Sequence, residues 1–411
     1  MKKLLFIYLS IFTVFILSCG NKVMNPTESV DGIVYYDVNN TETAKFNISV
    51  FYEDLNKPEV LNDIEFKKVA ESDNAIVYIE SGQSFDMNNV KSFFNKFEEN
   101  YDEEVRIYGE PISLPNINND KLVFLIYNFF PKYPLAGGGF FNISDLYDNK
   151  KDPVLNKGKY MYIDIKFVKE VNIVFGVMLH EFQHLINVSV NRVNEKQTMN
   201  LWLNEALSES TSVLFAPAIS GGRNKIFNLL PYYSFYSWYI NDIIPTRSSF
   251  DAINVSYSSS SVFMEWILEK GGKEAIRAIA NSDPSLETRA RLVNSVKDLN
   301  IGNDIEEIFI SWIKDIYYGR LNQFTVRPFD FWDDTYSNLL MDPNKGLALV
   351  PGGFIIYDAN KYNLDNIQGL KKQVLDAEKN LYLVWNPKFD SVDAEGHVSE
   401  NDVIWINATP K

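Results

Sequence analysis

The amino-acid sequence predicts an α+β protein of two or three domains. Its 411 residues exceed the roughly 100 to 200 residues of one ordinary domain. Short runs rich in Val, Ile, Tyr and Phe predict strands towards both ends of the chain, while apolar residues recur at helical spacing from Val171 to Tyr318. Hydrophobic residues make up 46% and charged residues 23%, which excludes wholesale disorder and a protein with many membrane spans.

The first element is a secretion signal. Two lysines precede an apolar run from Leu4 to Leu17, which is shorter than the roughly 20 residues that a mature membrane-spanning helix needs. The run leads to Cys19 and resembles a lipobox, in which the cysteine is acylated and becomes the new N-terminus. A plain cleaved signal with an unrelated cysteine is the alternative.

Cys19 is the only cysteine, so the mature chain has no internal disulfide and no multi-thiolate metal site. We expect residues 1–19 to be a lipoprotein signal peptide and the protein to be exported and anchored to a bacterial membrane. Two acyl chains hold a protein at a membrane, whereas one binds only marginally. Gly20 carries no inner-membrane retention signal, which favours the outer membrane or cell surface.

Residues 20–73 are expected to hold a tether and a small β-containing region. The residues that follow Cys19 are polar and include a proline, as in a linker. Strand-like runs follow at Gly32–Val38 and Phe46–Phe51.

Residues 74–320 form the predicted central domain, in which strands precede a helical part. Strands are expected at Asn74–Ile79, Leu122–Tyr127 and Tyr160–Ile165, with a helix at Met87–Glu99 between the first two. The run Gly138–Phe141 is expected to be either an edge strand that can pair with an extended peptide or an internal strand with a bulge. Apolar spacing then predicts helices at Val171–Val188, Leu201–Phe215, Ser259–Glu269, Lys273–Ala280, Leu286–Val296 and Ile305–Tyr318.

Residues 321–411 are expected to form a β-rich C-terminal domain. Aromatic and β-branched runs return there, for example at Gly353–Tyr357 and Asn380–Trp385, with turn residues between them.

The predicted helix at Val171–Val188 carries an HExxH motif from His180 to His184. Residues four apart lie on one helix face, so both imidazoles can reach one ion, and Glu181 lies about 100° further round the helix as a candidate base. The chain has only three histidines, two of them in this motif, which disfavours a chance match. Burying two imidazoles and a carboxylate on an apolar helix without an ion would also be costly.

A catalytic zinc ion takes three protein ligands and leaves a fourth position for water. The metzincin pattern requires a glycine and a third histidine downstream, but those positions hold Asn187 and Val190, which excludes that class. Glu205 follows His184 by 21 residues, and Glu205 and Glu209 share one face of a predicted helix.

HEFQHLIN followed by WLNEALSE resembles the thermolysin-like gluzincins, and most closely the hyicolysin family of bacterial metallopeptidases. The resemblance spans about Leu122 to Tyr318. It implies a gluzincin-like catalytic domain with a mixed β-sheet lobe, an active-site helix and a helical lower lobe.

The same resemblance assigns roles to single residues. His180, His184 and Glu205 would bind one Zn²⁺ per chain, and Glu181 would be the general base. Glu209 would orient His180 from outside the ligand set, with Asn204 beside it, although the family usually has Asp where this chain has Glu209.

Tyr257 is the candidate donor to the oxyanion of the tetrahedral intermediate, because several gluzincins carry such a residue just ahead of the corresponding helix. Four other tyrosines compete for this role, at positions 232, 233, 236 and 239. His397 lies in an acidic stretch and is expected to be a solvated loop residue.

These residues predict a membrane-anchored endopeptidase that acts on protein or peptide substrates by metal-assisted hydrolysis. A non-catalytic binding or adhesion lipoprotein with the same fold and a gluzincin aminopeptidase are the alternatives. Nucleic acid is not expected as a partner, because the formal net charge is −15 and phosphate binding relies on concentrated positive charge. The sequence does not indicate an oligomeric state.

Overall fold

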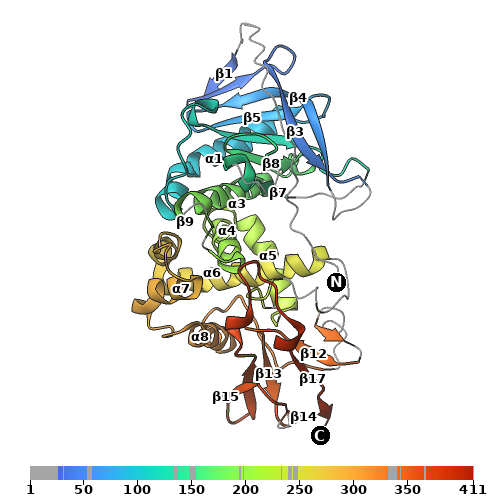
Figure 1. Ribbon diagram of the computed structural model, residues 1–411, viewed down its shortest axis with the longest axis vertical. Helices are drawn as coiled ribbons and strands as arrows, with labels where there is room; N and C mark the ends of the chain where they lie inside the picture. Colours follow the sequence, from blue (N-terminus) through green and yellow to red (C-terminus); the bar gives the residue numbers. More distant parts are fainter. Residues whose placement is uncertain are drawn as a thin grey trace. The chain divides into compact units, whose positions relative to one another are not determined.

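The computed structural model describes residues 26–30, 32–52, 58–132, 138–147, 154–193, 196–197, 199–232, 234–238, 243, 249–331, 340–342, 344–364 and 367–410. The protein is α+β, as predicted (Figure 1). Its contacts divide it into two compact units, Met1–Val190 and Asn191–Lys411.

The first unit contains a sheet of eight described strands and the helices α1, α2 and α3. Its strands are β1 Pro26–Val30, β2 Ile33–Tyr36, β3 Thr43–Val50, β4 Glu59–Glu71, β5 Ala75–Glu80, β6 Leu122–Tyr127, β7 Gly139–Phe141 and β8 Tyr160–Asp164. Its helices are α1 Met87–Tyr108, α2 Ile143–Leu146 and α3 Val171–Val190, with 3₁₀ turns at Asn118–Asp120 and Ile165–Phe167.

The sheet runs in the order β1-β2-β4-β5-β6-β8-β7, with β3 paired to β4. Strands β5, β6 and β8 are parallel and the other pairs are antiparallel. Because β4 pairs with β5, the boundary expected between residues 73 and 74 falls inside one continuous sheet.

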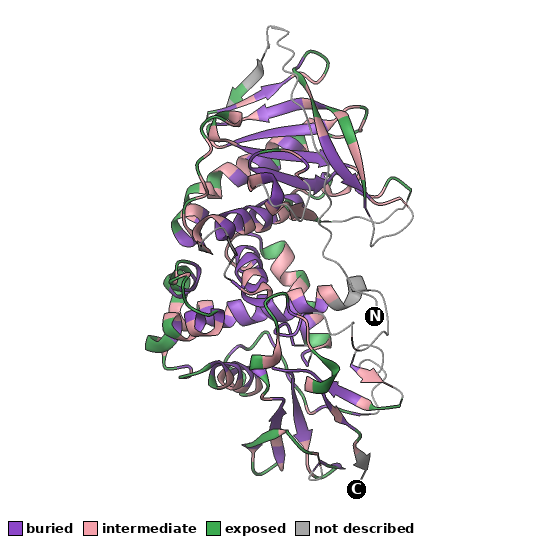
Figure 2. Cartoon of the chain, viewed as in Figure 1, coloured by how far each residue is buried: buried purple, intermediate pink, exposed green. Residues whose placement is uncertain are grey.

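The parallel strands are buried on both faces, which explains why β6 reads as six consecutive apolar or aromatic residues (Figure 2). On one face Phe124 meets Phe97 of α1 at 4.9 Å between ring centroids. On the other face Phe66 and Tyr127 belong to a second apolar cluster. This double burial makes the centre of the sheet a rigid support for α3.

Helix α1 follows from its sequence. Asp86 caps its first turn by accepting a hydrogen bond from Asn88 N at 2.8 Å. The buried residues Val90, Phe93 and Phe97 follow at helical spacing. The helix continues nine residues beyond the predicted end at Glu99, to Tyr108.

Helix α3 is apolar because it is a core helix. It packs on α1, β7 and β8, and Phe182 stacks on Tyr101 of α1 at 5.1 Å. Among the described residues it is the one helix long and apolar enough to cross a membrane, yet 67% of its most apolar window is buried inside the protein.

The second unit begins with helices and ends with short strands. Its helices are α4 Leu201–Phe215, α5 Pro217–Leu229, α6 Ser249–Ala280, α7 Thr288–Val296 and α8 Ile305–Tyr317, with 3₁₀ turns at Lys297–Leu299, Phe389–Ser391 and Glu400–Asp402. Its strands are β9 Arg192–Val193, β10 Lys196–Gln197, β11 Met341–Asp342, β12 Gly346–Leu349, β13 Phe354–Asp358, β14 Tyr362–Asn363, β15 Lys371–Asp376, β16 Leu381–Trp385, β17 Ile404–Ile406 and β18 Thr409–Pro410.

Helix α6 packs against α4, α5 and α7. It joins two helices predicted separately, and Gly272 between them leaves the helical region with φ 65° and ψ −167°. A glycine adopts this conformation without the steric penalty of a side chain. Helix α5 was not predicted.

The C-terminal strands share an aromatic core with the helices of the same unit. Trp312 of α8 contacts Phe354 of β13 at 6.2 Å, and Phe309 of α8 contacts Phe389 at 5.5 Å between ring centroids. The boundary expected between residues 320 and 321 therefore lies within one unit.

Candidate metal centre

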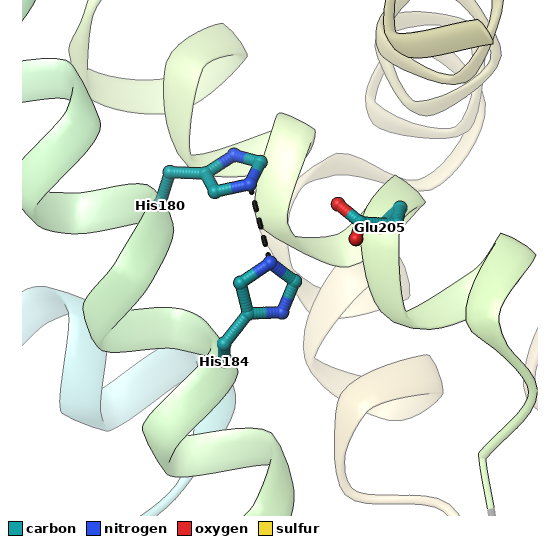
Figure 3. Close-up of side chains that lie close together, drawn as sticks. All are labelled: His180, His184 and Glu205. Atoms are coloured by element: carbon teal, nitrogen blue, oxygen red, sulfur yellow. Dashed lines mark hydrogen bonds between the residues drawn. The ribbon is translucent and has the colours of Figure 1, made fainter. Parts of the chain in front are cut away.

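The two histidines of the HExxH motif lie one turn apart on α3, as their spacing predicts. Their Nε2 atoms are 3.2 Å apart, and the ring planes are inclined at 83°. Both rings project from α3 towards the carboxylate of Glu205, which α4 carries (Figure 3).

His180, His184 and Glu205 form a group that could hold a metal ion. One potential ligand atom from each residue lies within 4.8 Å of the others. Both histidines are half-buried, and Glu205 is buried with 7% exposure. The structure thus brings together the three residues predicted as ligands.

The donor set fits zinc in chemistry and spacing. Two imidazole nitrogens and one carboxylate oxygen are the ligands of many catalytic zinc sites. A tetrahedral ion with Zn–N bonds of about 2.0–2.1 Å holds two ligand nitrogens about 3.3 Å apart. The observed Nε2–Nε2 separation of 3.2 Å is close to that value.

Backbone hydrogen bonds hold the first turns of the two helices that carry these residues. Helix α3 begins beside Glu170, whose carbonyl accepts hydrogen bonds from Ile173 N and Val174 N at 2.7 and 3.1 Å. Glu181 is 6% exposed on this helix. At the start of α4, Leu201 N donates to Ala394 O at 2.8 Å, so a C-terminal loop holds the first turn of the helix that carries Glu205.

Glu209 lies one turn beyond Glu205 and is 1% exposed. Its two carboxylate oxygens accept hydrogen bonds from Arg223 of α5, Nε to Oε2 at 3.0 Å and Nη2 to Oε1 at 3.1 Å. Its predicted role in orienting His180 stays a prediction, as does the predicted role of Asn204, whose carbonyl accepts a hydrogen bond from Ser208 Oγ at 3.2 Å.

Tyr257 lies within α6, two turns after the helix begins, and not just ahead of the helix as expected. The guanidinium of Arg223 lies 4.7 Å from the centroid of its ring. Trp238 meets the same ring at 5.2 Å with an interplanar angle of 85°.

Two of the competing tyrosines are buried in the core of the second unit. Tyr232 is 2% exposed, and Tyr236 is 1% exposed and donates from its hydroxyl to Phe389 O at 3.2 Å. The other two, at positions 233 and 239, lie outside the described residues. His397 is half-buried in a loop, and its backbone N–H donates to Asp393 Oδ1 at 2.9 Å.

Strand β7 is the last strand at one side of the described sheet, and it pairs with β8 alone. This supports the edge-strand alternative. Gly139 of β7 lies so close to α3 that an added Cβ would come within 2.7 Å of Val177 Cγ1, one turn before His180. The edge strand and the histidine pair are therefore neighbours.

Sequence reasoning missed Arg223 and Trp238. Arg223 follows two glycines in α5, which obscure the helical pattern, and its link to Glu209 depends on how two helices pack. Cys19 lies outside the described residues.

No family model and no curated protein matches the chain. Its function therefore has to be inferred from the residues themselves.

Proposed function

We propose that this chain is a zinc-dependent endopeptidase. The observation that carries the proposal is the group of His180, His184 and Glu205, with ligand atoms within 4.8 Å of one another and with Glu181 next to the first histidine. A base beside a pair of histidines on one helix, with a carboxylate as third ligand, is the arrangement of a metallopeptidase.

The chemistry divides between the ion and the chain. Zinc bound here would act as a Lewis acid, acidifying water and polarising the scissile carbonyl. Glu181 takes a proton from the attacking water and returns it to the leaving amine. Tyr257 is the proposed donor to the developing oxyanion.

The edge strand β7 supports a peptide as the substrate. An extended peptide can add to a free strand edge through backbone hydrogen bonds, which do not depend on its side chains. Since Gly139 packs against α3 near His180, a peptide on this edge would run beside the helix that carries the histidines.

We also propose that the protein is a lipoprotein anchored through Cys19, as the lipobox-like leader indicates. The body would then act at a bacterial membrane, on proteins or peptides outside the cytoplasm.

The test of activity is metal content and casein cleavage by the chain without residues 1–19, beside Glu181→Gln. Because a general base contributes roughly 10²- to 10⁴-fold, the variant should lose at least about 100-fold in rate while binding one zinc ion. Glu170→Gln, an exposed change just before the same helix, is the matched control and should cleave like the parent.

Chelation should abolish cleavage by the parent, and added Zn²⁺ should restore it. Zinc binding without cleavage of any protein or peptide library would favour the non-catalytic binding lipoprotein. A parent chain that binds no zinc would overturn the proposal.

A further inference from the structure

Arg223 links two residues of the predicted site that lie on different helices. It holds Glu209 of α4 through two hydrogen bonds of 3.0 and 3.1 Å. Its remaining terminal nitrogen, Nη1, donates to Asn254 Oδ1 of α6 at 3.1 Å, and its charge lies 4.7 Å from the ring centroid of Tyr257.

The hydrogen bonds fix the plane of the guanidinium. A two-point contact with a carboxylate restrains an arginine far more than a single ion pair does. Glu209 is only 1% exposed, and a buried carboxylate needs a partner of opposite charge. The Arg223 side chain is 19% exposed, so it is itself largely shielded from water.

Tyr257 is consequently held from two directions. The cation lies over its ring, which is a favourable electrostatic contact. Trp238 meets the ring at 85° and is 3% exposed. Trp238 in turn packs against the C-terminal loop. A Cβ added at Gly396 of that loop would lie 2.7 Å from the Cβ of Trp238.

We propose that Arg223 is a positioning residue that acts through Tyr257, fixing the orientation of the phenol for the oxyanion while it neutralises Glu209. This inference rests on the proposed peptidase function. It assigns to Arg223 no contact with the zinc ion or with the scissile bond.

Arg223→Met tests the proposal in the full chain, in parallel with Tyr257→Phe and the double variant. Misplacing a catalytic group lowers rates by about 10- to 100-fold, so we expect Arg223→Met to lower kcat on that scale, with KM little changed and one zinc ion retained. In the Tyr257→Phe background, which lacks the hydroxyl, the same change should have little further effect. Lys225→Met removes an exposed charge from the same helix and is the matched control.

Arg223→Lys separates charge from geometry, since a lysine retains a cation but not the two-point grip. We expect it to recover only part of kcat. If Arg223→Met shows no cooperative thermal transition and is therefore not folded, the same cycle with Tyr257→Phe is measured with Arg223→Lys in its place. An equal loss of kcat from the arginine change with and without the Tyr257 hydroxyl would overturn the proposal, as would no loss at all.

A second cycle does not depend on activity. Unfolding of Arg223→Met, Tyr257→Leu and the double variant measures whether the side chains stabilise each other, because Leu removes the ring. If the parent cleaves nothing but the two changes have coupled effects on stability, the contact between Arg223 and Tyr257 is supported and the proposed peptidase function is contradicted. If the parent is active but the changes at Arg223 and Tyr257 act independently on both kcat and stability, the peptidase function is supported and the positioning role of Arg223 is contradicted.

Discussion

Glu104 of α1 lies in an environment that does not favour a charged carboxylate. Its side chain is fully buried, and neither carboxyl oxygen has a hydrogen-bond partner among the described atoms. Burial raises its pKa well above the ordinary value. The folded protein therefore keeps this carboxyl protonated to a higher pH than the unfolded chain does.

The neutral carboxyl makes stability depend on pH. In the unfolded chain Glu104 loses its proton at about pH 4.3, the ordinary value for glutamate. The folded state keeps the proton to higher pH. Its contribution to stability is fully present below that unfolded pKa and is lost as the pH rises towards the folded pKa. Between these two pKa values the free energy of unfolding falls by up to about 1.4 kcal/mol per pH unit, because folded and unfolded states differ by one bound proton.

Glu104→Gln should remove this dependence, because glutamine does not titrate. We expect the variant to match the parent near pH 4 and to exceed its stability at pH 7 to 8, as measured by denaturant unfolding across that range. Glu99→Gln, an exposed change on the same helix, is the control. A parallel pH slope in Glu104→Gln and the parent would show that another group is responsible.

The histidine pair could be predicted because its geometry is local: four-residue spacing on one helix determines where the rings point. Glu205 was found by resemblance and is confirmed as a member of the group that could hold a metal. The role of Arg223 could not be predicted, because it depends on contacts with Glu209 and Tyr257, which lie 14 and 34 residues from it along the chain.

At the scale of elements, β7 pairs with β8 along one edge and with no other described strand along the other. Phe140 stacks on Tyr162 of β8 at 4.5 Å, which fixes the strand against the core. Asp164 N donates to Gly138 O at 3.1 Å, so in this antiparallel ladder alternate residues, 138 and 140, bond to β8. The backbone groups of Gly139 and Phe141 consequently face away from β8, on the side where no described strand pairs with β7.

Phe141→Pro tests whether substrates use that edge. Proline removes an outward N–H without breaking the ladder to β8. Losing one peptide hydrogen bond of roughly 0.5–1.5 kcal/mol should lower kcat/KM for peptides roughly 3- to 10-fold. Zinc content should not change.

Phe141→Leu controls for loss of the aromatic ring, because it keeps the N–H. The edge-binding model fails if the proline and leucine variants have the same kcat/KM.

Elements with strong apolar periodicity were predicted closely, and α4 and β6 were predicted to the residue. Helix α5 was missed because Gly221 and Gly222 interrupt it, and β4 was missed because charged residues run through its 13 positions. In both cases packing against neighbours overrides a weak local preference.

For the molecule as a whole, the changes of element type near residues 73 and 320 do not coincide with the division into two compact units after Val190. The strands before residue 73 join the central sheet through β4 and β5, and those after residue 320 share aromatic contacts with α8. Which strands pair is decided by contacts distant in sequence, which periodicity does not report.

The proposed membrane attachment also concerns the whole molecule. The described helix with enough length and apolarity to span a membrane is α3, and it is used in the core. In the proposed function, attachment would depend on a lipid at Cys19.

Replacing residues 1–19 with a cleavable leader that has no lipobox should move the exported protein from the detergent phase to the aqueous phase in phase partitioning. The intact chain, produced in the same cells, is the control. A detergent-phase signal that survives the replacement would place the membrane contact in the body of the protein.

The pairing of His180 with His184, whose Nε2 atoms lie 3.2 Å apart, also makes the centre easy to observe by spectroscopy. With only three histidines in 411 residues, selective isotopic labelling of histidine would give a magnetic resonance spectrum with few imidazole signals. Two of them would report the centre, while His397 would serve as an internal reference from elsewhere in the fold. The signals of His180 and His184 would therefore report directly whether this single site is occupied.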